Sequence, residues 1–120
     1  MENNTELLID KIVKGIQEKK GHDIVIIDLQ DIEDTVCKTF VICTGNSPSQ
    51  VQALADSVSE TARREAQSKP TAVDGLRQSM WVAMDYVDVI VHIFLPDMRD
   101  FYDIEHLWAD ARLTEIEDLD

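Results

Sequence analysis

The sequence predicts a single α/β domain in which helices flank a mixed sheet of four to five strands. Its length of 120 residues is that of one domain. Residues 5–20 and 47–69 carry apolar side chains at helical spacing. Short apolar runs lie between and after these two segments, and such runs are typical of strands. Strands and helices that follow one another in this way indicate an α/β architecture.

The first predicted helix runs from Thr5 to Lys20, and Asn3 followed by Glu6 resembles a capping box at its start. Two strands are expected next, at Ile24–Leu29 and Thr39–Cys43. The first of them contains the run IVII, a continuous apolar stretch of the kind found in strands buried on both faces. These elements supply the first half of the predicted core.

The second helix has a clear start. Ser47 is placed to cap it and Pro48 suits its first turn, while Pro70 sets a limit on its end. Residues 71–78 are expected to form a loop, because Asp74-Gly75 is a turn signal. Strand, helix and the strand that begins at Met80 then predict a βαβ-like crossover.

A hairpin follows the loop, with strands at Met80–Met84 and Val89–Leu95. A two-residue loop at Tyr86-Val87 would pair Met84 with Val89. Val87 is β-branched and disfavours the positive φ of a primed turn, so another turn type or a bulge is expected. Because strand side chains alternate, one face of the hairpin is aliphatic and suits the core. The other face suits either a second core or a partner and carries Trp81, Ala83, Ile90, His92 and Phe94.

The last third is predicted to hold a helix that opens at Pro96-Asp97, with Asp97 as a candidate cap. Its apolar face would contain Phe101, Ile104, Leu107 and Trp108. A short edge strand is expected near Leu113–Ile116. We assign residues 1–112 to the domain and residues 113–120 to an acidic C-terminal tail.

The net charge of −13 is the most informative total. Such a charge repels a nucleic-acid backbone and favours basic protein partners, so direct sequence-specific nucleic-acid binding is not expected. No apolar run approaches the roughly 20 residues of a membrane span. Cys37 and Cys43 lack metal-site spacing, and their usage fits a reducing cytoplasm.

Several residues admit a chemical interpretation and a plainer one. Asp85 and Asp88 would face each other at the hairpin end and could hold Mg²⁺, but aspartate is also a common turn residue. The Gly45–Ser47 turn could bind phosphate, although ordinary capping explains it. His92 could be a general base or a buried core histidine. Arg99 and Tyr102 lie on a solvated helix face or on the rim of an interface.

The run WVAMDYVDVIVHIFLPDMRDFYDIEHLWADA resembles the signature of the ribosomal silencing factors, the RsfS or Iojap family. The residues that carry the resemblance are Trp81, Asp85, His92, Phe94, Arg99, Phe101-Tyr102 and Leu107-Trp108. Upstream, the run FVICTGNS from Phe40 to Ser47 is similar to the first motif of the family. The two motifs together are specific, and the resemblance covers nearly the whole chain.

This resemblance implies a fold like a nucleotidyltransferase core without the catalytic set, and therefore no enzyme activity, cofactor or metal. It also implies binding to the large ribosomal subunit through ribosomal protein L-fourteen. There the protein would block joining of the small subunit and repress translation when nutrients are short. Self-association as a homodimer is a further implication. The rival hypothesis is a minimal nucleotidyltransferase or nucleotide-binding enzyme that uses Asp85 and Asp88.

We expect the contact surface to combine hairpin and helix residues. The aromatic side chains and the two aspartates are its main components, because Trp, Tyr and Arg dominate interface energetics and acidic groups suit a basic partner. The predicted partner-binding residues are Trp81, Met84, Asp85, Tyr86, Asp88, His92, Phe94, Arg99, Tyr102 and Trp108.

Overall fold

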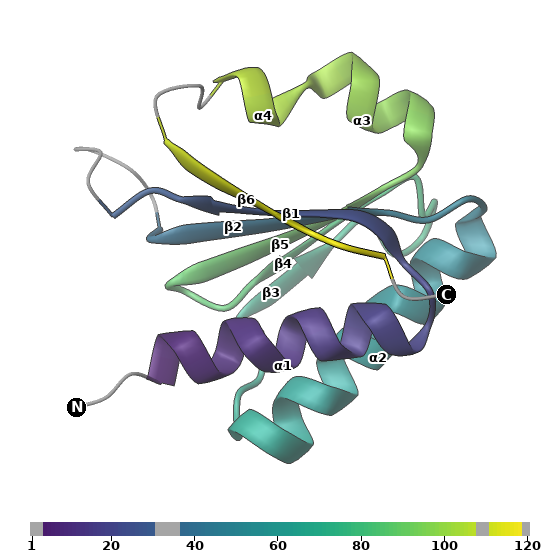
Figure 1. The fold of residues 1–120 in the computed structure, drawn as a ribbon. Helices are drawn as coiled ribbons and strands as arrows, with labels where there is room; N and C mark the ends of the chain where they lie inside the picture. The colour runs from purple at the N-terminus through teal and green to yellow at the C-terminus, as the bar shows by residue number, and fades with distance from the viewer. Residues whose placement is uncertain (1–3, 31–36, 108–110, 119–120) are drawn as a thin grey trace.

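The computed structural model describes residues 4–30, 37–107 and 111–118. Within these residues, six strands form one mixed sheet in the order β3-β4-β5-β2-β1-β6. Two long helices cover one face, and a short helical pair covers part of the other (Figure 1). The elements in chain order are α1 (Asn4–Glu18), β1 (His22–Asp28), β2 (Thr39–Thr44), α2 (Pro48–Ala66), β3 (Ala72–Asp74), β4 (Trp81–Asp85), β5 (Val89–Phe94), α3 (Pro96–Tyr102), α4 (Ile104–Leu107) and β6 (Arg112–Ile116).

The predicted α/β class is confirmed, and the sheet has one strand more than expected. The additional strand is β3, which lies in the segment expected to be a loop and pairs antiparallel with β4. It is only three residues long, and its sequence lacks the apolar run that marks a strand. The predicted edge strand near the C-terminus is present as β6, which pairs antiparallel with β1.

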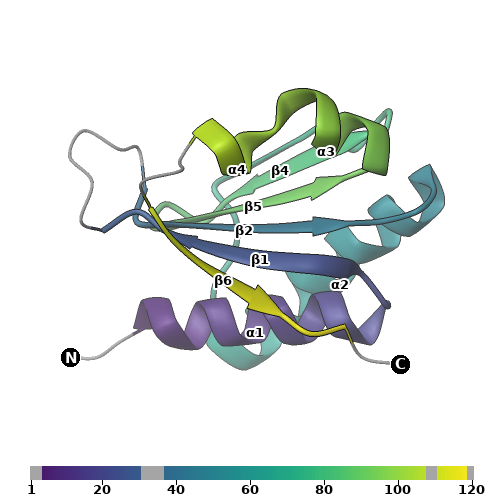
Figure 2. The ribbon, with the colours of Figure 1, turned by 45° about the horizontal axis from the view of Figure 1, so that its top comes forward.

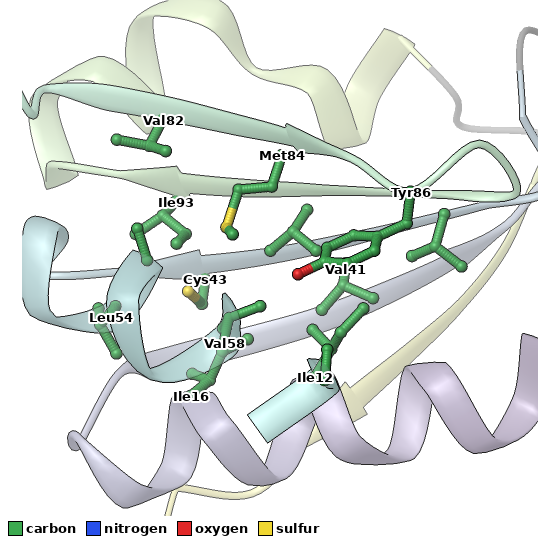
Figure 3. Packing of buried hydrophobic residues seen from close by; sticks show 14 of the residues in the cluster. Ile12, Ile16, Val41, Cys43, Leu54, Val58, Val82, Met84, Tyr86 and Ile93 are labelled. Atoms are coloured by element: carbon green, nitrogen blue, oxygen red, sulfur yellow. The ribbon is translucent and has the colours of Figure 1, made fainter. Parts of the chain in front are cut away.

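The main core lies between the sheet and the two long helices (Figure 3). The helices approach closely at Gly15, where a Cβ atom would lie 3.0 Å from the Ser57 carbonyl oxygen. The Ser57 hydroxyl donates a 2.7 Å hydrogen bond to the Gly15 carbonyl at the same point. A side chain at position 15 would therefore crowd the α2 backbone, and glycine suits this close approach of the helices.

The start of α2 is as predicted. Ser47 is its N-cap, and the Ser47 Oγ accepts a hydrogen bond from the Gln50 backbone nitrogen at 3.1 Å. The Gln50 side chain in turn accepts from the Asn46 backbone nitrogen at 2.7 Å. The Gly45–Ser47 turn and Gln50 therefore satisfy backbone N–H groups at the N-terminus of α2, as ordinary capping does. The capping box expected at Asn3 lies outside the described residues.

The predicted crossover to the strand at Met80 is wrong. The parallel partner of β2 is β5, the second strand of the hairpin, and β4 lies antiparallel to β5. The connection from β2 to β5 therefore contains α2, β3 and β4. Helical and strand periodicity indicate that a crossover exists, but they do not specify which strand receives it.

The hairpin register also differs from the prediction by two residues. Met84 pairs with Val91, and Trp81 pairs with Phe94. The expectation of a turn other than a primed one is confirmed, although Val87 adopts a positive φ of 76° within it. Across it the Asp88 backbone nitrogen donates to the Tyr86 carbonyl at 2.9 Å, as in a γ-turn. A shift of two residues preserves which side chains share a face, so the predicted division into two faces is correct.

Candidate functional site: the sheet face under α3 and α4

Helices α3 and α4 lie over one face of the sheet (Figure 2), and that face carries an aromatic cluster. Its centre is Trp81, whose ring stacks on Phe94 with centroids 5.0 Å apart and packs on Tyr102 of α3 at 4.5 Å. The Trp81 indole nitrogen also donates a 3.0 Å hydrogen bond to Nδ1 of His92. The cluster therefore joins strands β4 and β5 to helix α3.

His92 is buried among these rings. Burial lowers the pKa of its imidazole to about 4, because desolvation disfavours the charged form. The Phe40 ring stands almost perpendicular to the imidazole at 4.9 Å. His92 Nε2 has no hydrogen-bond partner among the residues that the structure describes. The plainer interpretation of His92, a core histidine, fits this placement.

Three large apolar or aromatic side chains of α3 and α4 are exposed. Phe101 is 77% exposed and Leu107 is 73% exposed, and Tyr102 between them is 43% exposed. The Phe101 and Tyr102 rings contact each other edge to face at 5.1 Å. Large exposed apolar side chains in one place mark an interaction surface. We call Phe101, Tyr102, Leu107 and the half-buried Trp81 the aromatic patch.

The prediction of one helix with a buried face at Phe101 and Leu107 is wrong. The helix ends at Tyr102, Asp103 takes the left-handed conformation with a φ of 48°, and α4 starts at Ile104. The break turns Phe101 and Leu107 outward, while Ile104 remains buried. Asp97 is also not a cap, since Leu95 holds that position and Pro96 opens the helix. An aspartate gives only a weak signal of such a break, which is why the exposed pair was missed.

Arg99 anchors α3 to the sheet. Its guanidinium forms a bidentate ion pair with Glu105, with distances of 3.2 and 2.7 Å. Nη1 donates to the Asp23 carbonyl at 2.6 Å and to the Thr44 hydroxyl at 2.8 Å. The side chain is 11% exposed, so its donors serve the protein itself.

The structure does not bring all the predicted contact residues together. Met84 and Tyr86 are buried in the core on the α1–α2 side of the sheet, as Figure 3 shows. Phe94 is buried in the opposite core, beneath Trp81. These three side chains are core residues in this fold, and they offer no surface to a partner. Trp108 lies outside the described residues.

Asp85 and Asp88 do not face each other, because Asp85 is paired with Ile90. The Asp85 carboxylate accepts a 2.8 Å hydrogen bond from the Val87 backbone nitrogen. The Asp88 carboxylate accepts from the Thr5 hydroxyl at 3.3 Å and lies 3.9 Å from Lys38 Nζ. Both side chains thus stabilise the turn and its surroundings, which is the plainer of the two interpretations.

A strongly acidic cavity of about 560 Å³ lies along α3 and α4, on the side of strands β1 and β6. It is bounded by strand β1, strand β6 and the helices α3 and α4. One imidazole and one guanidinium, those of His22 and Arg99, share it with a much larger number of carboxylates. The acidic residues that line it are Asp23, Asp100, Asp103, Glu105, Glu115, Glu117 and Asp118. The cavity attracts cationic groups and repels phosphate.

None of the helices in residues 4–30, 37–107 and 111–118 is both long and apolar enough to cross a membrane.

Comparison with known proteins gives a consistent result. The family model "Ribosomal silencing factor during starvation" matches residues 2–120. The chain is 36% identical to the ribosomal silencing factor RsfS of Halalkalibacterium halodurans, over 96% of each chain. A crystal structure of a Chromobacterium violaceum protein superposes with a TM-score of 0.82 at 33% identity, covering 90% of this chain and 88% of that one.

A more distant relative is the mouse protein named "Mitochondrial assembly of ribosomal large subunit protein 1". It is 26% identical over 90% of this chain, which spans 50% of the mouse protein. The family model and the closely similar bacterial relative cover almost all of the sequence, and the solved structure has the same fold. The chain belongs to the ribosomal silencing factor family, RsfS.

Proposed function

We propose that this protein binds the large ribosomal subunit through ribosomal protein L-fourteen and sterically blocks association with the small subunit. Translation would thereby be repressed under nutrient limitation, in keeping with the family description, which names starvation. The observation that carries the proposal is the aromatic patch, an exposed apolar surface on a member of this family. L-fourteen is the partner that the sequence resemblance implies.

The charge distribution supports a basic protein partner. The aromatic patch and the acidic cavity share α3 and α4, so one docking partner could meet both. Apolar anchors surrounded by complementary charge are the usual anatomy of a specific interface. The charge also disfavours displacement of the protein onto ribosomal RNA, whose phosphates the carboxylates repel.

The name of the mouse relative associates that protein with the large ribosomal subunit. This association favours the large subunit over the small one as the partner here. A protein that acts on ribosomes in this way is expected in the cytoplasm, as the cysteine usage also predicts.

The proposed contact set is narrower than the one predicted from sequence. Trp81, Tyr102, Asp85 and Asp88 remain in it, since each is at least partly exposed. His92 holds Trp81 from below, Arg99 anchors α3 to the sheet, and Trp108 stays a prediction. Phe101 and Leu107 are added to the set because of their exposure. The protein acts in this proposal by occlusion and not by catalysis.

Two further predictions accompany the proposal. The first is that the chain forms a homodimer. The second is that residues 1–112 form the docking domain and residues 113–120 form an acidic tail. Strand β6 spans this division and lies at one edge of the sheet. Analytical ultracentrifugation of the full chain and of a version ending at residue 112 would test both.

The function is tested by co-sedimentation of the purified protein with isolated large and small subunits, followed by a subunit-joining assay in magnesium. We expect selective binding to the large subunit and fewer joined ribosomes. Trp81→Ala should weaken binding by about 2 kcal/mol if Trp81 is a hot spot. The matched control is Leu7→Ser. Leu7 is 41% exposed on α1, on the opposite side of the sheet from the aromatic patch, so this variant should bind as wild type does. Absence of wild-type binding at moderate salt would contradict the proposal.

A further inference from the structure

We propose that His92 is a positioning residue for the docking surface, because its imidazole holds the Trp81 indole in the orientation that a partner meets. The inference rests on the proposed function and adds a residue that makes no contact with the partner itself. His92 is 7% exposed and lies beneath the aromatic patch.

The first argument is geometric. Trp81 is half-buried, and its ring packs on Phe94 and Tyr102. The χ2 torsion of a tryptophan has two broad wells, which place the indole nitrogen on opposite sides of the ring axis. The 3.0 Å hydrogen bond from the indole nitrogen to His92 Nδ1 selects one of them.

The second argument concerns the proton. An indole nitrogen only donates, so Nδ1 must be the acceptor and the proton of the neutral imidazole must lie on Nε2. Protonation of Nδ1 would place two donors against each other. Burial keeps the imidazole neutral, and the acceptor therefore remains available to Trp81.

The third argument is that the arrangement leaves a cost uncompensated. His92 Nε2 is buried with no hydrogen-bond partner among the described residues. A buried donor without a hydrogen bond is unfavourable, and an apolar side chain at this position would avoid that cost. His92 therefore makes a hydrogen bond through Nδ1 and none through Nε2 among the described residues, as expected if its role is to supply the Nδ1 acceptor to Trp81.

The consequence is that binding loses affinity when the acceptor is removed. A freed Trp81 would have to be ordered on binding, and ordering one such side chain weakens association by about two- to tenfold. His92→Leu removes the acceptor at similar volume. His92→Gln offers a side-chain carbonyl oxygen to the indole in place of Nδ1.

The test is a double-mutant cycle measured by affinity for isolated large ribosomal subunits. We expect His92→Leu to weaken binding by about two- to tenfold and His92→Gln to restore it to within about twofold of wild type. Trp81→Phe lacks the indole donor, so adding His92→Leu to it should cause no further loss. Equal losses from His92→Leu in the two backgrounds would overturn the inference.

A spectroscopic measurement separates this inference from the proposed function. In ¹H–¹⁵N spectra of the free protein, the Trp81 indole N–H, assigned by its loss in Trp81→Phe, should be protected from solvent exchange. The protection should be lost in His92→Leu and kept in His92→Gln. If wild type fails to bind large subunits, the proposed function is wrong; if it binds and the indole N–H is unprotected, the positioning role is wrong.

Discussion

The two faces of the sheet are covered very differently. Helices α1 and α2, of 15 and 19 residues, cover one face and bury an almost purely aliphatic core. On the other face α3 and α4 have seven and four residues, and the smaller core beneath them mixes aliphatic side chains with the rings of Phe40, Trp81 and Phe94. On that second face Phe101 and Leu107 remain in solvent.

The difference indicates a division of labour. Burial of large aliphatic side chains contributes about 1.5–3 kcal/mol each, so the face with the long helices supplies most of the stability. A short helical pair leaves apolar surface uncovered, which costs stability and is retained where a partner covers it. Substitutions of buried residues on the first face should therefore change folding, and substitutions of the exposed residues on the second should change binding.

The largest expected effect is on the helix-covered face. Ile12→Ala removes a fully buried side chain from the main core and should lower the free energy of unfolding by about 2–5 kcal/mol. Urea unfolding followed by circular dichroism measures this loss. The folded fraction should bind large subunits as wild type does. A loss under 1 kcal/mol would contradict the assignment of stability to this face.

Acidification should lower the free energy of unfolding through His92, which is buried on the sheet face under α3 and α4. Its pKa is about 4 in the folded protein and roughly 6.5 when unfolded, so between these values only the unfolded chain binds the proton. The free energy of unfolding therefore falls as pH drops from about 6.5 to 4, by up to about 3 kcal/mol. Urea unfolding of wild type and His92→Gln at several pH values isolates this contribution. Identical pH dependence in the two proteins would show that His92 is not buried and neutral.

Binding should depend on the aromatic patch with little effect on folding. Phe101→Ala removes a side chain that is 77% exposed, so the free energy of unfolding should change by no more than about 0.5 kcal/mol. Affinity for the large subunit should fall by about 2 kcal/mol if Phe101 is a hot spot. Titration of labelled protein with subunits measures the change, with Leu7→Ser as the control. If Phe101→Ala lowered the free energy of unfolding by more than it weakened the binding free energy, Phe101 would be a folding residue and not a contact residue.

The smallest expected effect is at the hairpin turn. Val87 has a φ of 76° and is 61% exposed, so its side chain contributes strain and little packing. Val87→Gly should raise the free energy of unfolding by about 1 kcal/mol. Val87→Ala keeps the unfavourable φ and should gain less. Thermal unfolding compares the three proteins, and a destabilised glycine variant would argue for a packing role of Val87.

Sequence patterns predicted the faces of the fold better than its pairings. Alternation along the hairpin assigned Val82 and His92 to opposite faces correctly, because a two-residue shift leaves the alternation unchanged. The register itself depends on the turn. A β-branched residue such as Val87 gives no sequence signal that it will adopt a positive φ. The start of α2 was predictable because Ser47 and Pro48 are strong local signals.

The candidate site was predictable only in part for a related reason. Trp81 and Tyr102 are conspicuous in the sequence, but their contact depends on how α3 docks on the sheet. Tyr86 follows the aliphatic face of β4 into the main core, a placement that hot-spot residue type does not reveal. The break at Asp103, which exposes Phe101 and Leu107, arises from a left-handed aspartate.

The central claim, that the face under α3 and α4 meets the ribosome, is tested most directly by hydrogen–deuterium exchange of the protein alone and bound to large subunits. The account predicts slower exchange on binding in Pro96–Leu107 and in β4, with the exposed side of α1 and α2 unchanged. Slower exchange confined to α1 and α2, with α3 and α4 unchanged, would contradict it.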